Sequence, residues 1–195
     1  FDGVEVSAGH GHLFHQFLSA HSNRRTDRFG GDLDGRMTLL RELVAAIRSA
    51  CGRDFVLGLK LPAEDGDPAG IDLAQAGQIA SALSDPQTID YVAFAWGAQN
   101  RQLHWHIPDG HWPRASYAEK TAELRRDTNG VPVMGLARIV DPNEGEAMLA
   151  RDQADFIGVG RALIADPAWT GKALSGRSHA IRPCVSCNTC WGAIA

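Results

Sequence analysis

The sequence predicts an α/β fold, namely a stretch of a parallel sheet covered by helices that belongs to a (β/α)₈ barrel. Two observations predict it: strand-like runs alternate with amphipathic helices five times, and the strand-like runs are almost continuously apolar. An open doubly wound sheet fits the same alternation, because five strand–helix units leave a barrel incomplete. The first residue, Phe1, already lies in an apolar strand-like run, which favours a barrel whose first three units lie outside this chain.

Periodicity and end signals predict each element in turn. The helix after the first strand has apolar residues at helical spacing, Asp72 is a candidate N-cap, and Pro142 suits the first turn of a later helix. A long polar stretch, residues 11–31, receives no element. The expected strands are Phe1–Ser7, Phe55–Leu61, Tyr91–Ala95, Val131–Leu136 and Phe156–Val159, and the expected helices are Arg36–Ala50, Asp72–Leu83, Ser116–Asp127, Asp141–Arg151, Ala162–Ala165 and Trp169–Leu174.

Composition excludes several classes of protein. The 195 residues are 44% hydrophobic and 22% charged, and the formal net charge of −4 gives no basic surface for nucleic acid or an anionic membrane. No apolar run is long enough to cross a bilayer and no secretion signal is present, so we expect a cytoplasmic protein. Of the four cysteines, three lie within seven residues, as metal ligands do in a reducing compartment, whereas the lone Cys51 is expected to be buried and inert.

Two strand ends carry a phosphate-like pattern. Gly135-Leu136-Ala137-Arg138 and Gly158-Val159-Gly160-Arg161 each place small residues and then an arginine at the start of a helical segment. Small residues let backbone N–H groups approach a phosphate, and a guanidinium adds charge-assisted hydrogen bonds. Barrels often bind phosphate in the loops after their last two strands. The alternative is that the glycines only make tight turns and the arginines pair with acidic residues.

Other chemistry-bearing residues follow the first two strands. Lys60 ends the second strand among apolar neighbours, which indicates a pocket or a buried ion pair. The alternative is that its aliphatic chain packs in the barrel while its ammonium group lies at the rim. His10 and His12 follow the first strand and could donate hydrogen bonds to a substrate or move protons. His15 is expected to be structural.

A histidine-rich loop follows the third strand. His104, His106 and His111 lie with Asp109 within eight residues, a set that could bind a metal, although its spacing matches no standard zinc site. We favour a substrate pocket in which Trp96 and Trp105 form apolar walls, and a purely structural loop remains an alternative.

The tail holds Cys184, Cys187 and Cys190 in the spacing C-x₂-C-x₂-C. This spacing gathers three thiolates around one centre, as at the start of a 4Fe–4S ligand run that needs a fourth cysteine. A structural zinc site is the alternative, although no histidine follows. We therefore divide the chain into residues 1–175, a partial barrel, and residues 176–195, the start of a cluster-binding segment.

These motifs resemble a known family. "HQFLS…SNRRTDRFGG…GR" within residues 3–36 and "PVMGLARIVDP…ADFIGVGRALIADPAW" are similar to the old yellow enzyme family of flavin oxidoreductases. The tail "CVSCNTC" resembles its iron–sulfur branch, which includes 2,4-dienoyl-CoA reductase and the trimethylamine and dimethylamine dehydrogenases. The resemblance covers nearly the whole chain.

The resemblance implies an FMN-binding barrel entered at its fourth strand, so that the chain spans about strands 4–8. It places Lys60 near the flavin pyrimidine, where the family usually has arginine, and it assigns the FMN phosphate to Ala137, Arg138, Gly160 and Arg161. Cys184, Cys187 and Cys190 would be cluster ligands, with the fourth ligand and an FAD/NAD(P)H domain beyond this chain. A half-barrel exposes unpaired strand edges, so we expect the isolated chain to be insoluble or to bind FMN poorly.

The chain departs from the family in its substrate residues. Ser7 stands where many members have His or Tyr, His10 keeps the second member of that pair, and His12 replaces a proton-donating Tyr. The expected function is hydride transfer between FMN and a small organic substrate, with an N-methylated amine or amino acid as the hypothesis and His10, His12, His104 and His106 as candidate catalytic groups. Electrons would pass to a separate carrier, and homo-oligomerisation stays open. An NAD(P)H-dependent enone or dienoyl-CoA reductase and a non-redox phosphate-binding barrel with structural zinc are the alternatives.

Overall fold

The computed structural model describes residues 1–98 and 102–192, which form two compact units. The first unit contains residues 1–106 and 123–133, and the second contains residues 107–122 and 134–192. Strand β4 (Val133–Gly135) begins as the last residue of the first unit and continues in the second. The predicted boundary near residue 175 stays a prediction. In the described part of the chain, no helix combines the length and the apolar character that crossing a bilayer requires.

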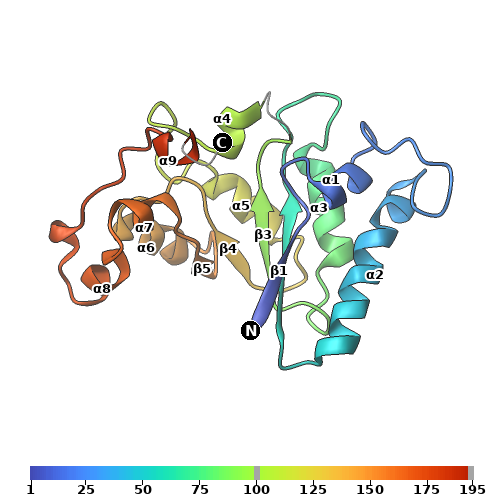
Figure 1. Cartoon of the computed structure of the whole chain (residues 1–195), viewed down its shortest axis with the longest axis horizontal. Helices are drawn as coiled ribbons and strands as arrows, with labels where there is room; N and C mark the ends of the chain where they lie inside the picture. Colours follow the sequence, from blue (N-terminus) through green and yellow to red (C-terminus); the bar gives the residue numbers. More distant parts are fainter. Residues whose placement is uncertain (99–101, 193–195) are drawn as a thin grey trace. The chain divides into compact units, whose positions relative to one another are not determined.

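The first unit is a parallel sheet covered by helices. Strands β1 (Gly3–Ser7), β2 (Val56–Pro62) and β3 (Tyr91–Ala95) pair in chain order, with Ser7 opposite Lys60 and Lys60 opposite Ala93. Val92 N–H donates to the carbonyl of Pro132, 2.9 Å away, so the chain entering β4 follows β3 in the same order. Helices α2 (Leu33–Cys51) and α3 (Leu73–Leu83) run alongside these strands in Figure 1.

Local sequence explains why these helices begin and end where they do. The Asp32 side chain accepts from Gly35 N–H to start α2, and Gly52, with φ of +76°, ends it in a conformation that suits glycine. The predicted N-cap of α3 is confirmed, since Asp72 accepts a hydrogen bond from Gln75 N–H. The residues that α2 buries include Met37, Leu40 and Val44.

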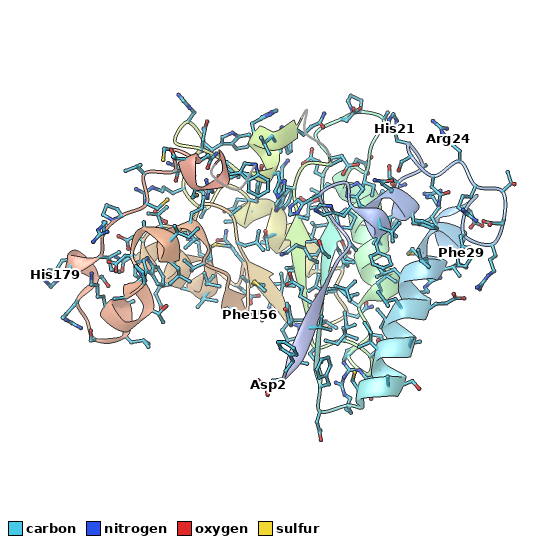
Figure 2. The ribbon with its side chains drawn as sticks, viewed as in Figure 1. Asp2, His21, Arg24, Phe29, Phe156 and His179 are labelled. Atoms are coloured by element: carbon cyan, nitrogen blue, oxygen red, sulfur yellow. The ribbon has the colours of Figure 1, made fainter. Side chains whose placement is uncertain are left out.

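Two expectations for this unit were wrong. The polar stretch contains a short helix, α1 (Leu13–Leu18), because Leu18 and His15 are buried and supply the packing that polar flanks conceal. Cys51 is exposed rather than buried, because it is the last residue of α2 and lies beyond the buried positions of that helix. The loop after α1, which carries Arg24 and Phe29, extends away from the strands (Figure 2).

The second unit repeats the strand–helix alternation. Strand β4 pairs in parallel with β5 (Phe156–Ile157), and between them lies α6 (Pro142–Ala150). Helix α6 begins with a capping box in which Asp141 and Glu144 bond each other's backbone N–H groups, and Pro142 occupies the first turn as predicted. Ile139, Met148 and Ala154 form a small core beneath it.

The remaining elements are short. Helix α4 (Leu103–His106) ends the first segment of the first unit, and α5 (Ala118–Arg125) begins in the second unit and ends in the first. After β5 come α7 (Arg161–Ala165), α8 (Trp169–Leu174), a 3₁₀ turn η2 (Ser178–Ala180) and α9 (Thr189–Gly192). All five predicted strands and the predicted helices are present with boundaries shifted by up to three residues, which confirms the α/β fold with its parallel sheet.

Candidate functional site

The carboxyl ends of β1, β2 and β3 bring predicted site residues together in the first unit. Ala8 N–H donates to the carbonyl of Lys60, 2.8 Å away, which fixes the chain leaving β1 against the end of β2. A Cβ atom on Gly9 would stand 2.2 Å from Cβ of Ala95, so only glycine lets this loop pass the end of β3. His10 follows with φ of +58°, a left-handed conformation that histidine adopts more readily than most residues.

His10 stacks on His106. Their ring centroids are 3.6 Å apart and the ring planes differ by 16°. Burial, followed by the positive charges of His106 and Lys60, lowers the pKa of His10 to about 3. Burial also lowers the pKa of His106, with His12 and Lys60 as smaller causes. Both imidazoles are therefore neutral at pH 7 and can each donate or accept a hydrogen bond.

The other predicted histidines lie in different surroundings. His12 is exposed yet near enough to lower the pKa values of His10 and His106, and His104 is exposed on α4. His15 is buried with its Nε2 3.1 Å from the Asp65 carboxylate, which agrees with the structural role expected of it.

Lys60 forms the ion pair that its sequence context allowed. Its Nζ lies 2.7 Å from Oε1 of Glu5 on β1, and both side chains are partly buried. The other Glu5 oxygen accepts a hydrogen bond from the hydroxyl of Tyr91, 3.2 Å away. Burial and then the Glu5 charge raise the pKa of Tyr91 to about 12. Sequence reasoning missed Glu5, although an acidic residue between Val4 and Val6 of the predicted strand was a usable signal.

The predicted phosphate loops both lie in the second unit. Ala137 and Arg138 have consecutive positive φ angles of 81° and 57°, so the chain turns sharply after β4. Gly160 begins α7 without a side-chain cap, and a Cβ atom on it would meet nothing within 4 Å. Open space beside an uncapped helix start is what an approaching phosphate needs.

The two arginines are used differently. Arg138 donates from Nε to Ser186 Oγ (3.2 Å), from Nη1 to the carbonyl of Trp112 and from Nη2 to that of Gly110 (3.4 Å). Arg161 donates from Nη1 alone, to the carbonyl of Pro108 (2.8 Å) and to Asn188 Oδ1. Within residues 1–98 and 102–192, the Nε–Nη2 edge of Arg161 has no protein acceptor, and this edge is the fork that binds phosphate with two parallel hydrogen bonds.

The cysteine loop has a shape suited to a cluster. Ser186 and Asn188 have φ of 56° and 60°, whereas Cys187 between them does not, and such alternation directs backbone N–H groups inward in many iron–sulfur sites. Ser186 N–H donates to Cys184 Sγ at 3.4 Å. Hydrogen bonds from Thr189 lower the pKa of Cys187, which favours the thiolate that binds metal. The backbone of this loop thus suits a cluster, whereas the three thiols do not converge as ligands within the described residues.

No complete metal site is formed by protein side chains alone. Across the described residues, no three His, Cys, Asp or Glu side chains converge as metal ligands. Asp109 and His111 are paired at 3.2 Å, and the His111 side chain is 95% exposed. The metal hypothesis for the histidine-rich loop therefore gains no support, whereas His106 of that loop joins His10.

Comparison with known proteins shows which family the chain belongs to. Residues 1–180 match the model of the NADH:flavin oxidoreductase / NADH oxidase family. A metal reductase of Desulforamulus reducens is 38% identical over 190 residues, which are 96% of this chain and 28% of that protein. An N,N-dimethylglycine/sarcosine dehydrogenase of Chromohalobacter salexigens is 32% identical over 191 residues, 97% of this chain and 27% of that protein.

A solved structure confirms the fold. A 2-naphthoyl-CoA reductase in complex with 2-naphthoyl-CoA superposes with a TM-score of 0.88 at 27% identity, covering 97% of this chain and 28% of that one. The chain thus spans little more than a quarter of the length of each of these three relatives, as a partial barrel would. Because the family model matches most of the residues, the chain belongs to the NADH:flavin oxidoreductase / NADH oxidase family.

Proposed function

We propose that the chain is part of an FMN- and 4Fe–4S-dependent oxidoreductase that oxidises a small N-methylated amine or amino acid. When bound, FMN supplies hydride chemistry at its ring and the cluster supplies one-electron transfer. The protein's part is to bind these groups, orient the substrate and control protons. The observation that carries the FMN assignment is the unoccupied Nε–Nη2 edge of Arg161 beside the open space at Gly160, within the described residues.

The phosphate of FMN would bind in the second unit. Arg161 offers two parallel donors, Gly160 leaves room, and the turn at Ala137 and Arg138 adds a second sharp loop. Arg138 is already occupied by two carbonyls and a hydroxyl, so it contributes charge more than free donors. Arg161 is therefore the principal anchor and Arg138 the supporting one.

Lys60 would stabilise negative charge on the flavin ring. Its ammonium is fixed by the Glu5 carboxylate 2.7 Å away, which limits its freedom to swing out to solvent. Because Glu5 neutralises part of its charge, Lys60 stabilises an anionic ring less than an unpaired cation would.

The stacked pair of His10 and His106 would receive the substrate. An amine must lose its ammonium proton before it can give up hydride. An imidazole whose pKa lies well below 7 is a weak base, so it would accept a hydrogen bond from the amine and orient it, while the proton leaves to solvent. Both imidazoles are neutral at pH 7, since burial lowers their pKa values. His12 and His104, both exposed, would connect the pair with solvent.

Cys184, Cys187 and Cys190 would bind the cluster, with a fourth ligand outside this chain. The similarity to a dimethylglycine/sarcosine dehydrogenase supports the amine substrate. FAD and NAD(P)H sites in the remainder of the protein, a separate electron carrier and a cytoplasmic location stay predictions.

One alternative has support from an observation. The relative that binds 2-naphthoyl-CoA favours an NAD(P)H-dependent reductase of enones or acyl-CoA thioesters. A neutral imidazole of the His10–His106 pair could donate a hydrogen bond to a substrate carbonyl in that reaction. The zinc alternative has no comparable support.

A stopped-flow experiment tests the proposal. Protein expressed from the complete gene would be mixed anaerobically with a panel of N-methylated amines and amino acids. In a second experiment the flavin would first be reduced, and the reduced protein would then be mixed with a panel of enones. We expect at least one amine to bleach the flavin within the dead time or seconds after it. Bleaching by no amine, together with reoxidation by an enone, would replace the amine hypothesis with the reductase. A colourless protein that contains zinc would reject both.

A further inference from the structure

The cysteine loop is joined to both predicted phosphate arginines by residues that lie between the cysteines. Asn188 accepts a hydrogen bond at Oδ1 from Arg161 and donates from Nδ2 to the carbonyl of Ile107, 2.9 Å away. Ser186 accepts at Oγ from Nε of Arg138, 3.2 Å away. All of these contacts lie within the second unit.

Both residues are held in backbone conformations that need support. Ser186 is 1% exposed and has φ of 56°, and Asn188 has φ of 60°. A left-handed backbone is unfavourable for serine and only tolerated by asparagine, so it persists where surrounding contacts hold it. The hydrogen bonds to the arginines are among the contacts that hold these two turns, together with the bond from Asn188 to Ile107.

The same hydrogen bonds determine how the arginines face. Asn188 and Pro108 together use both N–H groups of Arg161 Nη1, which leaves the Nε–Nη2 edge directed away from them. Without Asn188, one of the two bonds that fix the guanidinium plane is lost. The arginine would then bind a phosphate less well, because its orientation would have to be fixed at binding.

We propose that Asn188 and Ser186 are positioning residues that make flavin-phosphate binding and cluster assembly depend on each other. This inference rests on the proposed function. We expect the larger effect from Asn188, because it bonds Arg161, whose Nε–Nη2 edge has no protein acceptor among the described residues. Loss of either residue would loosen the cysteine loop and the arginine at the same time.

The test uses protein from the complete gene with Asn188→Ala, Ser186→Ala and the control Val185→Ala. Val185 lies in the same loop with a side chain 73% exposed. The measurements are the Kd of FMN and of riboflavin after flavin removal, and the iron and acid-labile sulfide per chain. We expect Asn188→Ala to raise the Kd of FMN about tenfold, to leave the Kd of riboflavin unchanged and to lower the iron content per chain.

Several results would overturn the inference. One is an Asn188→Ala protein that binds FMN and retains iron as the Val185→Ala protein does. Loss of only one of the two properties would also overturn it, since the proposal requires both to change. If Asn188→Ala does not fold, Ser186→Ala decides by the same measurements. Failure of the unaltered protein to bind FMN would instead reject the proposed function.

Discussion

Oε1 of Glu5 lies 2.7 Å from Nζ of Lys60, and this ion pair joins β1 to β2. Glu5↔Gly58 and Gly58↔Tyr91 are register partners, which explains how one carboxylate reaches both Lys60 and the Tyr91 hydroxyl. The strand pairing thus places a fixed cation near the two neutral imidazoles.

Replacing Glu5 should destabilise the first unit. Glu5→Gln leaves the partly buried Lys60 ammonium without a charge partner, which we expect to cost about 1–3 kcal/mol. The control Tyr91→Phe removes one hydrogen bond to the same carboxylate and should cost about 0.5–1.5 kcal/mol. Chemical denaturation of both variants measures the difference. Equal stability of the two variants would show that the ion pair contributes little.

The pH dependence of stability should report His10. Its pKa is about 3 in the folded protein and 6.5 without the fold, so between these values only the unfolded state binds the proton. Stability should therefore fall as the pH is lowered from 6.5 towards 3. Above pH 6.5, His10 is neutral in both states and no longer affects the pH dependence of stability. His10→Asn tolerates the left-handed backbone and removes the titration. Urea unfolding at pH 5 and pH 7 should show a smaller pH effect for this variant, and an unchanged pH effect would contradict the buried, neutral imidazole.

Serine variants should show that iron binding depends on the clustered cysteines and not on Cys51. Cys184→Ser removes a thiolate ligand from the C-x₂-C-x₂-C loop, and we expect the iron content to fall to near zero because an incomplete ligand set releases the cluster. Cys51→Ser alters an exposed thiol at the end of α2 and should leave the iron content unchanged. Iron and sulfide analysis of the purified proteins checks both. Retention of iron by Cys184→Ser would remove this cysteine from the ligand set.

Gly97 should be needed for the position of His106. It has φ of +77°, and a Cβ atom would lie 2.7 Å from the carbonyl oxygen of Gln102 and 3.1 Å from the backbone N of His106. Gly97→Ala should destabilise the protein and slow flavin reduction, since α4 must move. Gly52→Ala is the matched control, because its φ is +76° and no atom lies within 4 Å of the added Cβ. Gly52→Ala should lose only the backbone conformational energy, about 1–3 kcal/mol, because φ of +76° with ψ of −177° is a region that glycine alone adopts readily. Equal flavin reduction rates in the two variants would mean that Gly97 does not position His106.

The fold could be predicted from sequence because its signals are local. Asp72, Pro142 and the apolar runs each act within one turn of helix or one strand, so their effect does not depend on distant residues. The short helix α1 escaped prediction because its burial depends on packing against α2 rather than on its own periodicity. Cys51 was placed wrongly because residue type predicts average burial, whereas its position at the end of a helix decides the actual exposure.

The candidate site could be predicted only in part. Functional side chains collect at the carboxyl ends of parallel strands, and this rule alone made His10, Lys60, Arg138 and Arg161 candidates, whose roles stay predictions. Their partners were not predicted. Glu5 reaches Lys60 through strand register, and Ser186 reaches Arg138 through a contact 48 residues along the chain.

The binding of FMN compared with riboflavin tests the central claim most directly. Riboflavin lacks the phosphate, so only FMN binding should depend on Arg161. We predict that Arg161→Ala weakens FMN binding by about ten- to a hundredfold and leaves riboflavin binding unchanged, while the exposed control Arg151→Ala alters neither. Equal FMN affinity in the Arg161→Ala and unaltered proteins would contradict the account.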